Sequence, residues 1–316
     1  MNLHEDTDGF ISLVSAVCAR FSTAFAVVEK DYYVTHLLKE IVSVCPETVF
    51  IGGTSLSKCY KCIDRFSEDI DLSYDNGKTR PTEGLIRRFN KGVLQCCLNN
   101  SFGELTDPPT REKPFSAGGR YHSFKIAYRS HFESSSIENN VRVEISLFSP
   151  VFPVQWATAS CYIADYLREE GKDDLIEEFG LAPFSIKTQT LEKTFIDKVF
   201  AICDCQIRGE KYRNSRHIYD LYRIFPRISA DENFKSLIGE IRTIRNARNK
   251  IRDSKYRAPS AKPESDINTL LTRIIEEETF KEDYLETTRD LLLGDYHPSY
   301  EEVASVLKKV IELNVF

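Results

Sequence analysis

One part of the sequence decides the fold: Phe50-Ile-Gly-Gly-Thr-Ser-Leu-Ser-Lys58, followed by Arg65-Phe-Ser-Glu-Asp-Ile-Asp-Leu72. The first stretch starts inside a short apolar run that is typical of a buried strand. Gly52 and Gly53 form a turn, and Thr54 is placed to cap a helix that follows. The second stretch alternates apolar and acidic residues, which is typical of a strand with one polar face. Together they predict a strand, a turn, a helix and an acidic strand.

The acidic strand presents two carboxylates on one face. Side chains two residues apart on a strand point the same way, so Asp69 and Asp71 lie together and Ser67 shares their face. Two carboxylates this close both stay ionised only when a cation lies between them. Mg²⁺ fits because it prefers oxygen ligands and substrate phosphates. A lone Asp-x-Asp on a solvated strand is the alternative interpretation.

A third carboxylate comes from Arg142-Val-Glu-Ile-Ser146, where Glu144 points away from the apolar side. If this strand pairs beside the acidic strand, Asp69, Asp71 and Glu144 converge as metal ligands and catalytic groups. Three converging carboxylates suit two metal ions that activate a hydroxyl and stabilise a pyrophosphate leaving group.

The glycine turn is a candidate phosphate site. Glycine lets the backbone approach a phosphate closely, and the N-terminus of the following helix favours negative charge. Lys58 lies one helical turn further on and is either a phosphate ligand or a solvated helix residue. The predicted nucleotide-binding residues are Gly52, Gly53, Thr54, Ser55, Lys58 and Ser67.

The rest of the chain predicts an α+β protein with two domains. Pro150 and Pro153 mark a boundary between a mixed-sheet core with N-terminal helices, residues 1–152, and a mostly α-helical domain, residues 153–316. The expected strands are 48–51, 68–73, 121–128, 141–148 and 184–188. The expected helices are 10–44, one after Pro81, 156–179, 190–208, 215–225, 231–251, 265–279, 281–293 and 299–313.

Composition restricts the class of protein. The 316 residues are 41% hydrophobic and 28% charged, which excludes a mostly disordered chain, a collagen-like rod and a coiled coil. The apolar runs are too short to span a bilayer and the N-terminus lacks a signal pattern, so we expect a cytoplasmic protein without a membrane partner. The nine cysteines lack a zinc pattern and are expected to be reduced thiols. Because the net charge is −6, contact with nucleic acid requires a local basic patch.

The quoted stretches resemble the signature of the AbiEii-type nucleotidyltransferases, toxins of type IV toxin–antitoxin systems in the DNA polymerase β-like superfamily. Three further segments resemble family motifs in the same order: Val28-Glu-Lys-Asp-Tyr-Tyr-Val34, Lys193-Thr-Phe-Ile-Asp-Lys-Val199 and Ser215-Arg-His-Ile-Tyr-Asp-Leu221. The resemblance covers about residues 28 to 225. It implies a polymerase β-like nucleotidyltransferase core, with Asp69 and Asp71 as metal ligands, Lys198 as a required cation and Asp220 as a required acid.

The residues alone leave the last two roles open. Lys198 lies near the apolar face of its helix, where it either neutralises a triphosphate or pairs with Asp197 or Asp204. Arg216 and Asp220 are four apart, so an ordinary ion pair within the helix is the alternative for Asp220.

A basic stripe is the candidate surface for an acceptor. Arg242, Arg245, Arg248 and Arg252 recur at helical spacing and predict one positive face, which suits a phosphate backbone, an antitoxin or simply solvent. A second basic group consists of Arg208, Lys211, Arg213 and Arg216. A third basic group, which includes Arg111 and Lys113, has Tyr121 and Phe124 interleaved for base stacking.

These features favour a Mg²⁺-dependent enzyme that transfers NMP from an NTP to RNA. The resemblance suggests the 3′ end of tRNA as acceptor and a winged-helix antitoxin as a partner. The alternatives are a nucleotidyltransferase acting on a small molecule or a protein, and a non-catalytic nucleotide-binding module.

Overall fold

The computed structural model describes residues 1–109, 116–134 and 137–316. The chain forms two compact units. Unit 1 comprises Met1–Lys61 and Phe66–Thr188, and unit 2 comprises Cys62–Arg65 and Gln189–Phe316. The boundary expected at residues 152–153 falls inside unit 1. The expected α+β class is confirmed, because unit 1 contains a mixed sheet and the described part of unit 2 is built from helices.

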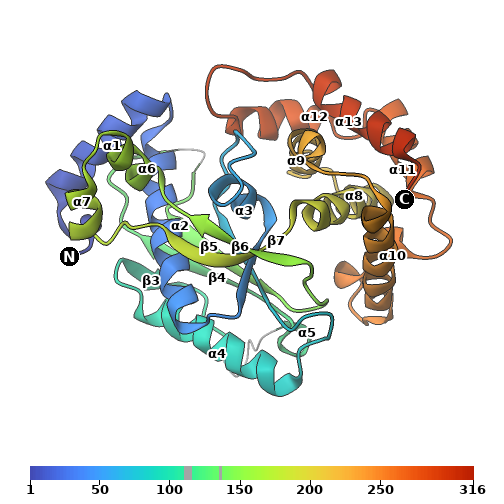
Figure 1. The fold of residues 1–316 in the computed structure, drawn as a ribbon, viewed down its shortest axis with the longest axis horizontal. Helices are drawn as coiled ribbons and strands as arrows, with labels where there is room; N and C mark the ends of the chain where they lie inside the picture. Colours follow the sequence, from blue (N-terminus) through green and yellow to red (C-terminus); the bar gives the residue numbers. More distant parts are fainter. Residues whose placement is uncertain (110–115, 135–136) are drawn as a thin grey trace. The chain divides into compact units, whose positions relative to one another are not determined.

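Unit 1 is built on a seven-stranded sheet with the order β3-β4-β5-β2-β1-β7-β6 among the described residues (Figure 1). β2 pairs antiparallel with β1 and parallel with β5. β1 pairs parallel with β7, and β4 pairs antiparallel with β3 and β5. The strands are β1 (Thr48–Ile51), β2 (Asp69–Tyr74), β3 (Gly103–Leu105), β4 (Tyr121–Tyr128), β5 (Asn140–Ser146), β6 (Val154–Ala159) and β7 (Phe184–Gln189).

The helices of unit 1 bury one face of this sheet. The central helix α2 contacts β2, β5 and α4, and most of its residues are buried. The Thr82 hydroxyl accepts a hydrogen bond from the Leu85 amide and so caps α4. The helices are η1 (Leu3–Glu5), α1 (Thr7–Phe21), α2 (Phe25–Val44), α3 (Gly52–Lys58), α4 (Glu83–Asn99), α5 (Ser116–Gly119), α6 (Tyr162–Glu169) and α7 (Asp173–Glu178).

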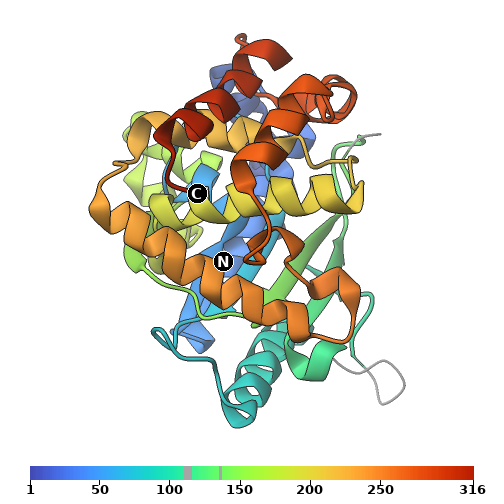
Figure 2. The ribbon, with the colours of Figure 1, turned by 90° about the vertical axis from the view of Figure 1, so that its right-hand side faces the viewer.

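Unit 2 is organised around α8. Thr190 caps its N-terminus, and Gly209 ends it in the left-handed conformation at φ 69°. α8 and α10 lie side by side, and η5 contacts both (Figure 2). The helices are α8 (Leu191–Arg208), α9 (Arg216–Ile224), η2 (Phe225–Arg227), α10 (Glu232–Asn246), η3 (Ala247–Lys250), η4 (Ser254–Tyr256), η5 (Pro259–Ala261), α11 (Ile267–Glu276), α12 (Lys281–Asp283), η6 (Tyr284–Thr288), η7 (Arg289–Leu291) and α13 (Tyr300–Leu313).

Three expected elements are wrong. The helix expected over 10–44 is broken at Ser22, which adopts the left-handed conformation at φ 50° between α1 and α2. The helix expected over 156–179 begins as β6, an edge strand that precedes α6 and α7. The helix expected over 281–293 divides into α12, η6 and η7, because its backbone changes from α-helical to π-helical and then to 3₁₀ geometry.

The cysteines and the apolar helices bear on two expectations from composition. All nine cysteines are free in the structure, and eight of them are buried. In the described part of the chain, no single helix is long and apolar enough to cross a membrane. Only α1 and α2 together pass that test, and they are bent by 114° at their junction.

Candidate active site

The acidic strand β2 and the strand β5 are direct neighbours. In their parallel register Asp71 lies opposite Glu144, and Asp69 lies opposite Arg142. The alternate residues Ile70 and Val143 are completely buried. Because residues in register share a face of the sheet, the three carboxylates lie on one partly exposed face. The sheet thus places Asp69, Asp71 and Glu144 together, as the sequence predicts, while their roles remain predictions.

Gly52 lies against the Asp71 carboxylate. It begins α3 at φ +79°, and a Cβ atom built there would lie 2.0 Å from Asp71 Oδ2. A non-glycine residue would therefore both clash and strain the backbone. The glycine turn thus lies against a site carboxylate, while its approach to a phosphate stays a prediction.

The hydroxyls beside the turn hold α3 and the acidic strand in place. Thr54 Oγ1 and Ser67 Oγ are 3.0 Å apart, and Ser55 Oγ donates to the Gly52 carbonyl over 2.9 Å. Thr54 and Ser55 are buried, whereas Ser67 is partly exposed. Thr54 does not cap the helix as expected, because α3 already begins at Gly52. Ser67 is the most exposed of these three residues.

Lys58 lies inside unit 1 rather than on its surface. Its ammonium donates to Asp31 Oδ1 and Thr35 Oγ1, each at 2.5 Å, and its side chain is 3% exposed. The neighbouring Lys30 forms a similar pair, 2.6 Å from Glu68 Oε2. Lys58 is therefore neither a solvated residue nor an exposed phosphate ligand. Both ion pairs connect α2 to the elements that carry the site.

Arg142 is a site residue that the sequence analysis did not single out. Its Nε lies 3.6 Å from Asp69 Oδ1, and its Nη1 lies 3.9 Å from Glu144 Oε1. These three side chains are each about one-third exposed. The signal was present in the sequence, because Arg142 and Glu144 are two apart on one strand and must share a face. The guanidinium partly neutralises the acidic face.

The acidic face fits a hard cation through its donor chemistry. Within the described ranges, no group of three or more His, Cys, Asp or Glu side chains is gathered closely enough to hold a metal ion. Mg²⁺ does not need such a group, because it binds through one or two carboxylates together with waters and substrate phosphates. Asp69 and Asp71, beside the close-approaching Gly52, supply such carboxylate oxygens.

Unit 2 contains a buried cluster of charges around Asp220. Arg65 Nε and Nη2 donate to its two carboxylate oxygens over 2.8 and 2.7 Å, and Lys198 Nζ donates to Oδ2 over 2.5 Å. Asp220 is completely buried, and the Lys198 side chain is 9% exposed. Lys198 thus pairs with Asp220 rather than with Asp197 or Asp204. Arg65 completes the cluster.

The charges around Asp220 shift its pKa and that of a neighbouring histidine. Burial by itself would raise the pKa of Asp220, but the charges of Arg65 and Lys198 outweigh it and hold that pKa below its usual range. Burial, reinforced by the Lys198 charge, lowers the pKa of the adjacent His217 well below its usual value, so this imidazole is neutral at pH 7. Two cations therefore share the Asp220 carboxylate, and removal of either one would leave a buried charge less well compensated.

Three arginines of the predicted basic stripe bind partners within unit 2. Arg245 pairs with Asp204 at 2.8 Å, while Arg242 and Arg248 donate to backbone carbonyls. Burial, and then the charge of Arg245, lower the pKa of Arg248 to about 10. The prediction of a single basic face is wrong, because α10 ends at Asn246 and the helical spacing does not continue to Arg248 and Arg252. The basic residues that remain exposed in this segment are Lys250, Arg252, Lys255 and Arg257.

The third basic group is only partly described. Arg111 and Lys113 lie outside the described residues. Phe124, expected to stack on a base, is completely buried on the core face of β4. That expectation is wrong, because Phe124 lies opposite Val143 in the sheet and points into the core.

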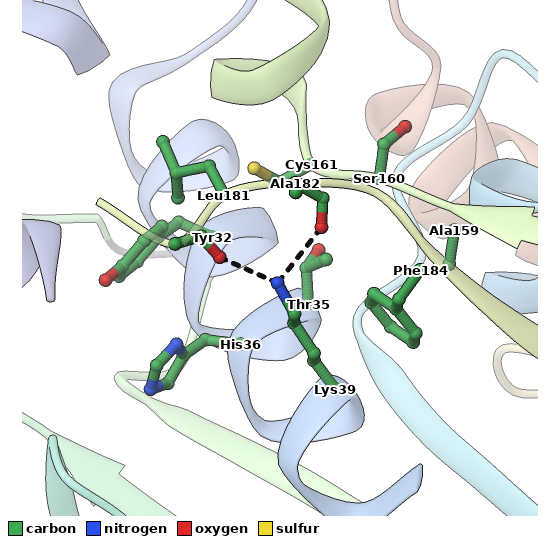
Figure 3. Close-up of a pocket in the computed structure, with 11 residues that line it drawn as sticks. Tyr32, Thr35, His36, Lys39, Ala159, Ser160, Cys161, Leu181, Ala182 and Phe184 are labelled. Atoms are coloured by element: carbon green, nitrogen blue, oxygen red, sulfur yellow. Dashed lines mark hydrogen bonds between the residues drawn. The ribbon is translucent and has the colours of Figure 1, made fainter. Parts of the chain in front are cut away.

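A small pocket in unit 1 lies away from the carboxylates. It is lined by α2 side chains, which include Tyr32 and His36, and by the segments around Cys161 and Leu181 (Figure 3). Its volume is about 20 Å³, enough for water but not for a nucleotide. Lys39 Nζ crosses it to donate to the carbonyls of Gly180 and Ala182 over 2.8 and 3.0 Å. The residues around this pocket therefore connect α2 to the segment 180–182 through Lys39.

Comparison with known families now identifies the chain. The family described as "Nucleotidyl transferase AbiEii toxin, Type IV TA system" matches residues 36–306, which include the glycine turn, the three carboxylates and the Asp220 cluster. The chain belongs to this family. It is therefore a nucleotidyltransferase toxin of a type IV toxin–antitoxin system, and the family implies a nucleotide substrate and an antitoxin partner.

A solved structure shows the same fold. MenT4, a nucleotidyltransferase toxin from Mycobacterium tuberculosis H37Rv, is similar over 96% of this chain and 89% of its own, with a TM-score of 0.60 and 17% sequence identity. Comparison with curated proteins found no match. The predicted family, fold class and enzyme class are confirmed.

Proposed function

We propose that this AbiEii-family enzyme uses Mg²⁺ to transfer NMP from an NTP to the 3′ end of a tRNA. The observation that carries the proposal is the register of β2 and β5, which places Asp69, Asp71 and Glu144 on one face beside Gly52. Nucleotidyl transfer needs such a face, because oxygen ligands for a cation and a proton acceptor must surround the reacting phosphate.

The proposed step forms one bond and breaks one bond. The 3′-hydroxyl oxygen of the acceptor attacks the α-phosphorus, and the bond from that phosphorus to the bridging oxygen of the β-phosphate breaks, which releases pyrophosphate. Bound Mg²⁺ would supply charge neutralisation at the reacting phosphates. Asp69 and Asp71 would hold it, while Glu144 would accept the proton of the attacking hydroxyl. Gly52 and Gly53 would let a phosphate approach the backbone.

The Asp220 cluster supports the handling of a triphosphate. Lys198 donates to Asp220 and is the most exposed member of this cluster, with 9% of its side chain accessible. In this proposal Lys198 stabilises phosphate charge and Asp220 is a positioning residue that holds Lys198 and Arg65. The acceptor assignment is supported by the exposed Lys250, Arg252, Lys255 and Arg257, which suit a phosphate backbone.

A label-transfer assay tests this function. Purified protein is incubated with Mg²⁺, one α-³²P-labelled NTP at a time, and either intact tRNA or tRNA whose 3′-terminal diol has been oxidised with periodate. We expect label on intact tRNA only, with removal of Mg²⁺ by EDTA abolishing transfer. Label on oxidised tRNA, on the protein or on a small molecule instead would contradict the proposed acceptor.

A further inference from the structure

Unit 2 has a surface hollow that neither the carboxylate face nor the Asp220 cluster uses. Its volume is about 400 Å³, within the range of ligand sites and large enough for one nucleotide. It lies where α9 and η2 meet α13. Its wall is formed mainly by three aromatic and three basic side chains: Tyr222, Phe225, Tyr296, Arg223, Arg227 and Lys309.

Two of the aromatic rings are fixed by one carboxylate. The hydroxyls of Tyr222 and Tyr296 both donate to Glu302 Oε1, over 2.7 and 2.5 Å. The bond to Glu302, reinforced by burial, raises the pKa of Tyr222 to about 12, so this hydroxyl remains a donor. The Tyr296 side chain is nevertheless 64% exposed. A large aromatic residue held in place yet open to solvent is ready to stack on a planar ligand.

The basic side chains make the hollow positive in a protein of net charge −6. The described residues that line it include no carboxylate. Two carboxylates contact lining residues: Asp64 Oδ2 pairs with Arg223 at 2.5 Å, and Glu302 Oε1 accepts from both tyrosines. Lys309 is exposed and lies 5.8 Å from the centre of the Phe225 ring. Cations and aromatic faces are therefore interleaved around one space.

We propose that this hollow binds the single-stranded end of the RNA acceptor, with a phosphate on Lys309 and a base on the Tyr296 ring. Interleaved cations and aromatic rings are the arrangement that binds single strands without requiring one sequence. The inference rests on the proposed function, because it assigns a binding subsite for the same acceptor.

Binding of defined RNAs tests the hollow directly. The probe is a 5′-fluorescent hairpin with a short single-stranded 3′ overhang, compared with the same hairpin ending blunt, in fluorescence anisotropy without NTP over about 50 to 200 mM KCl. We compare wild type with Tyr296→Ala and Lys309→Gln. Lys308→Gln is the matched control, because Lys308 is an exposed lysine of the same helix that does not line the hollow.

We expect Tyr296→Ala to weaken binding of the overhang RNA by about fivefold or more, and Lys309→Gln to reduce the slope of log K against log salt by about 0.7. Both variants should bind the blunt hairpin like wild type, and Lys308→Gln should bind both RNAs like wild type. Melting curves confirm that the variants are folded.

Two results would overturn the assignment. One is wild-type binding of the overhang by both Tyr296→Ala and Lys309→Gln. The other is full competition by free NTP, with NTP binding lost in these variants, which would make the hollow a mononucleotide site. Failure of the proposed function shows separately, as wild-type protein that transfers no label to tRNA even though overhang binding is intact.

Discussion

The geometry at Gly52 favours glycine for two reasons. Its Cβ position overlaps Asp71 Oδ2 at 2.0 Å, and its φ is +79°. We predict that Gly52→Ala lowers the transfer rate by about 100-fold or more, because Asp71 must move, and lowers the free energy of unfolding by about 1–2 kcal/mol. The transfer assay and urea denaturation measure these two effects.

Gly171→Ala is the matched control. Gly171 also has a positive φ, +67°, but no atom lies within 4 Å of its Cβ position. Gly171→Ala should lower the free energy of unfolding through backbone strain alone, and its transfer rate should equal that of wild type. Equal losses of activity in the two variants would show that backbone strain, and not the contact with Asp71, is responsible.

Asp220 gives a second prediction at this scale, because its carboxylate is completely buried between Arg65 and Lys198. Asp220→Asn should lower the free energy of unfolding by about 3–5 kcal/mol at pH 7. Since the folded-state pKa of Asp220 is below the unfolded value, its contribution is fully present above about pH 4 and is lost as pH falls through the folded-state pKa.

Urea denaturation across pH checks this sign. The difference in unfolding free energy between wild type and Asp220→Asn should be flat from about pH 8 to pH 5 and shrink in more acidic solution. Asp290→Asn, at an exposed aspartate of unit 2, should change little at any pH. A difference that grows toward acidic pH would contradict the cluster as described.

At the scale of elements, sequence reasoning succeeded where local pattern and tertiary burial agree. β1, β2, β4 and β5 were predicted within about two residues because their apolar residues alternate and their ends carry turn residues. Periodicity predicted the wrong element where pairing with a neighbouring strand determines the secondary structure. β6 lies beside β7 at the sheet edge, and Val154, Trp156 and Thr158 were a strand signal that the helical interpretation ignored.

The candidate site also has one part that the sequence predicts and another part that it does not. Alternation within one strand was enough to place Asp69 with Asp71, and the pairing of β2 with β5 then added Glu144. The partners of Lys58 and Arg65 lie 27 and 155 residues away along the chain, so no local pattern reveals them. Long-range ion pairs are therefore the part of the site that the sequence does not disclose.

The capping of α8 provides a prediction about an element. Thr190 Oγ1 accepts a hydrogen bond from the Lys193 amide at the start of the helix that carries Lys198. Thr190→Ala should lower the free energy of unfolding by about 1 kcal/mol. Thr243→Ala, which removes an exposed hydroxyl that bonds only within α10, should stay within about 0.5 kcal/mol of wild type. Equal effects in chemical denaturation would contradict the capping role.

At the scale of the whole molecule, the two units carry different parts of the proposed chemistry. Unit 1 holds the carboxylate face and the glycine turn, and unit 2 holds Lys198 and Asp220. Residues 62–65 pass from unit 1 to unit 2 and back, so Arg65 belongs to unit 2 although only three residues separate it from Asp69 in the chain. The family match from residue 36 to 306 spans both units, consistent with one enzyme.

The most direct test of the central claim compares two aspartates of one strand region. Asp71 faces Gly52, whereas Asp75, just after β2, pairs with Lys187 over 2.8 Å. The measurement is the initial rate of α-³²P label transfer to tRNA for wild type, Asp71→Asn and Asp75→Asn. We predict a loss of about 100-fold or more for Asp71→Asn only. Transfer by Asp71→Asn at the wild-type rate would contradict the account.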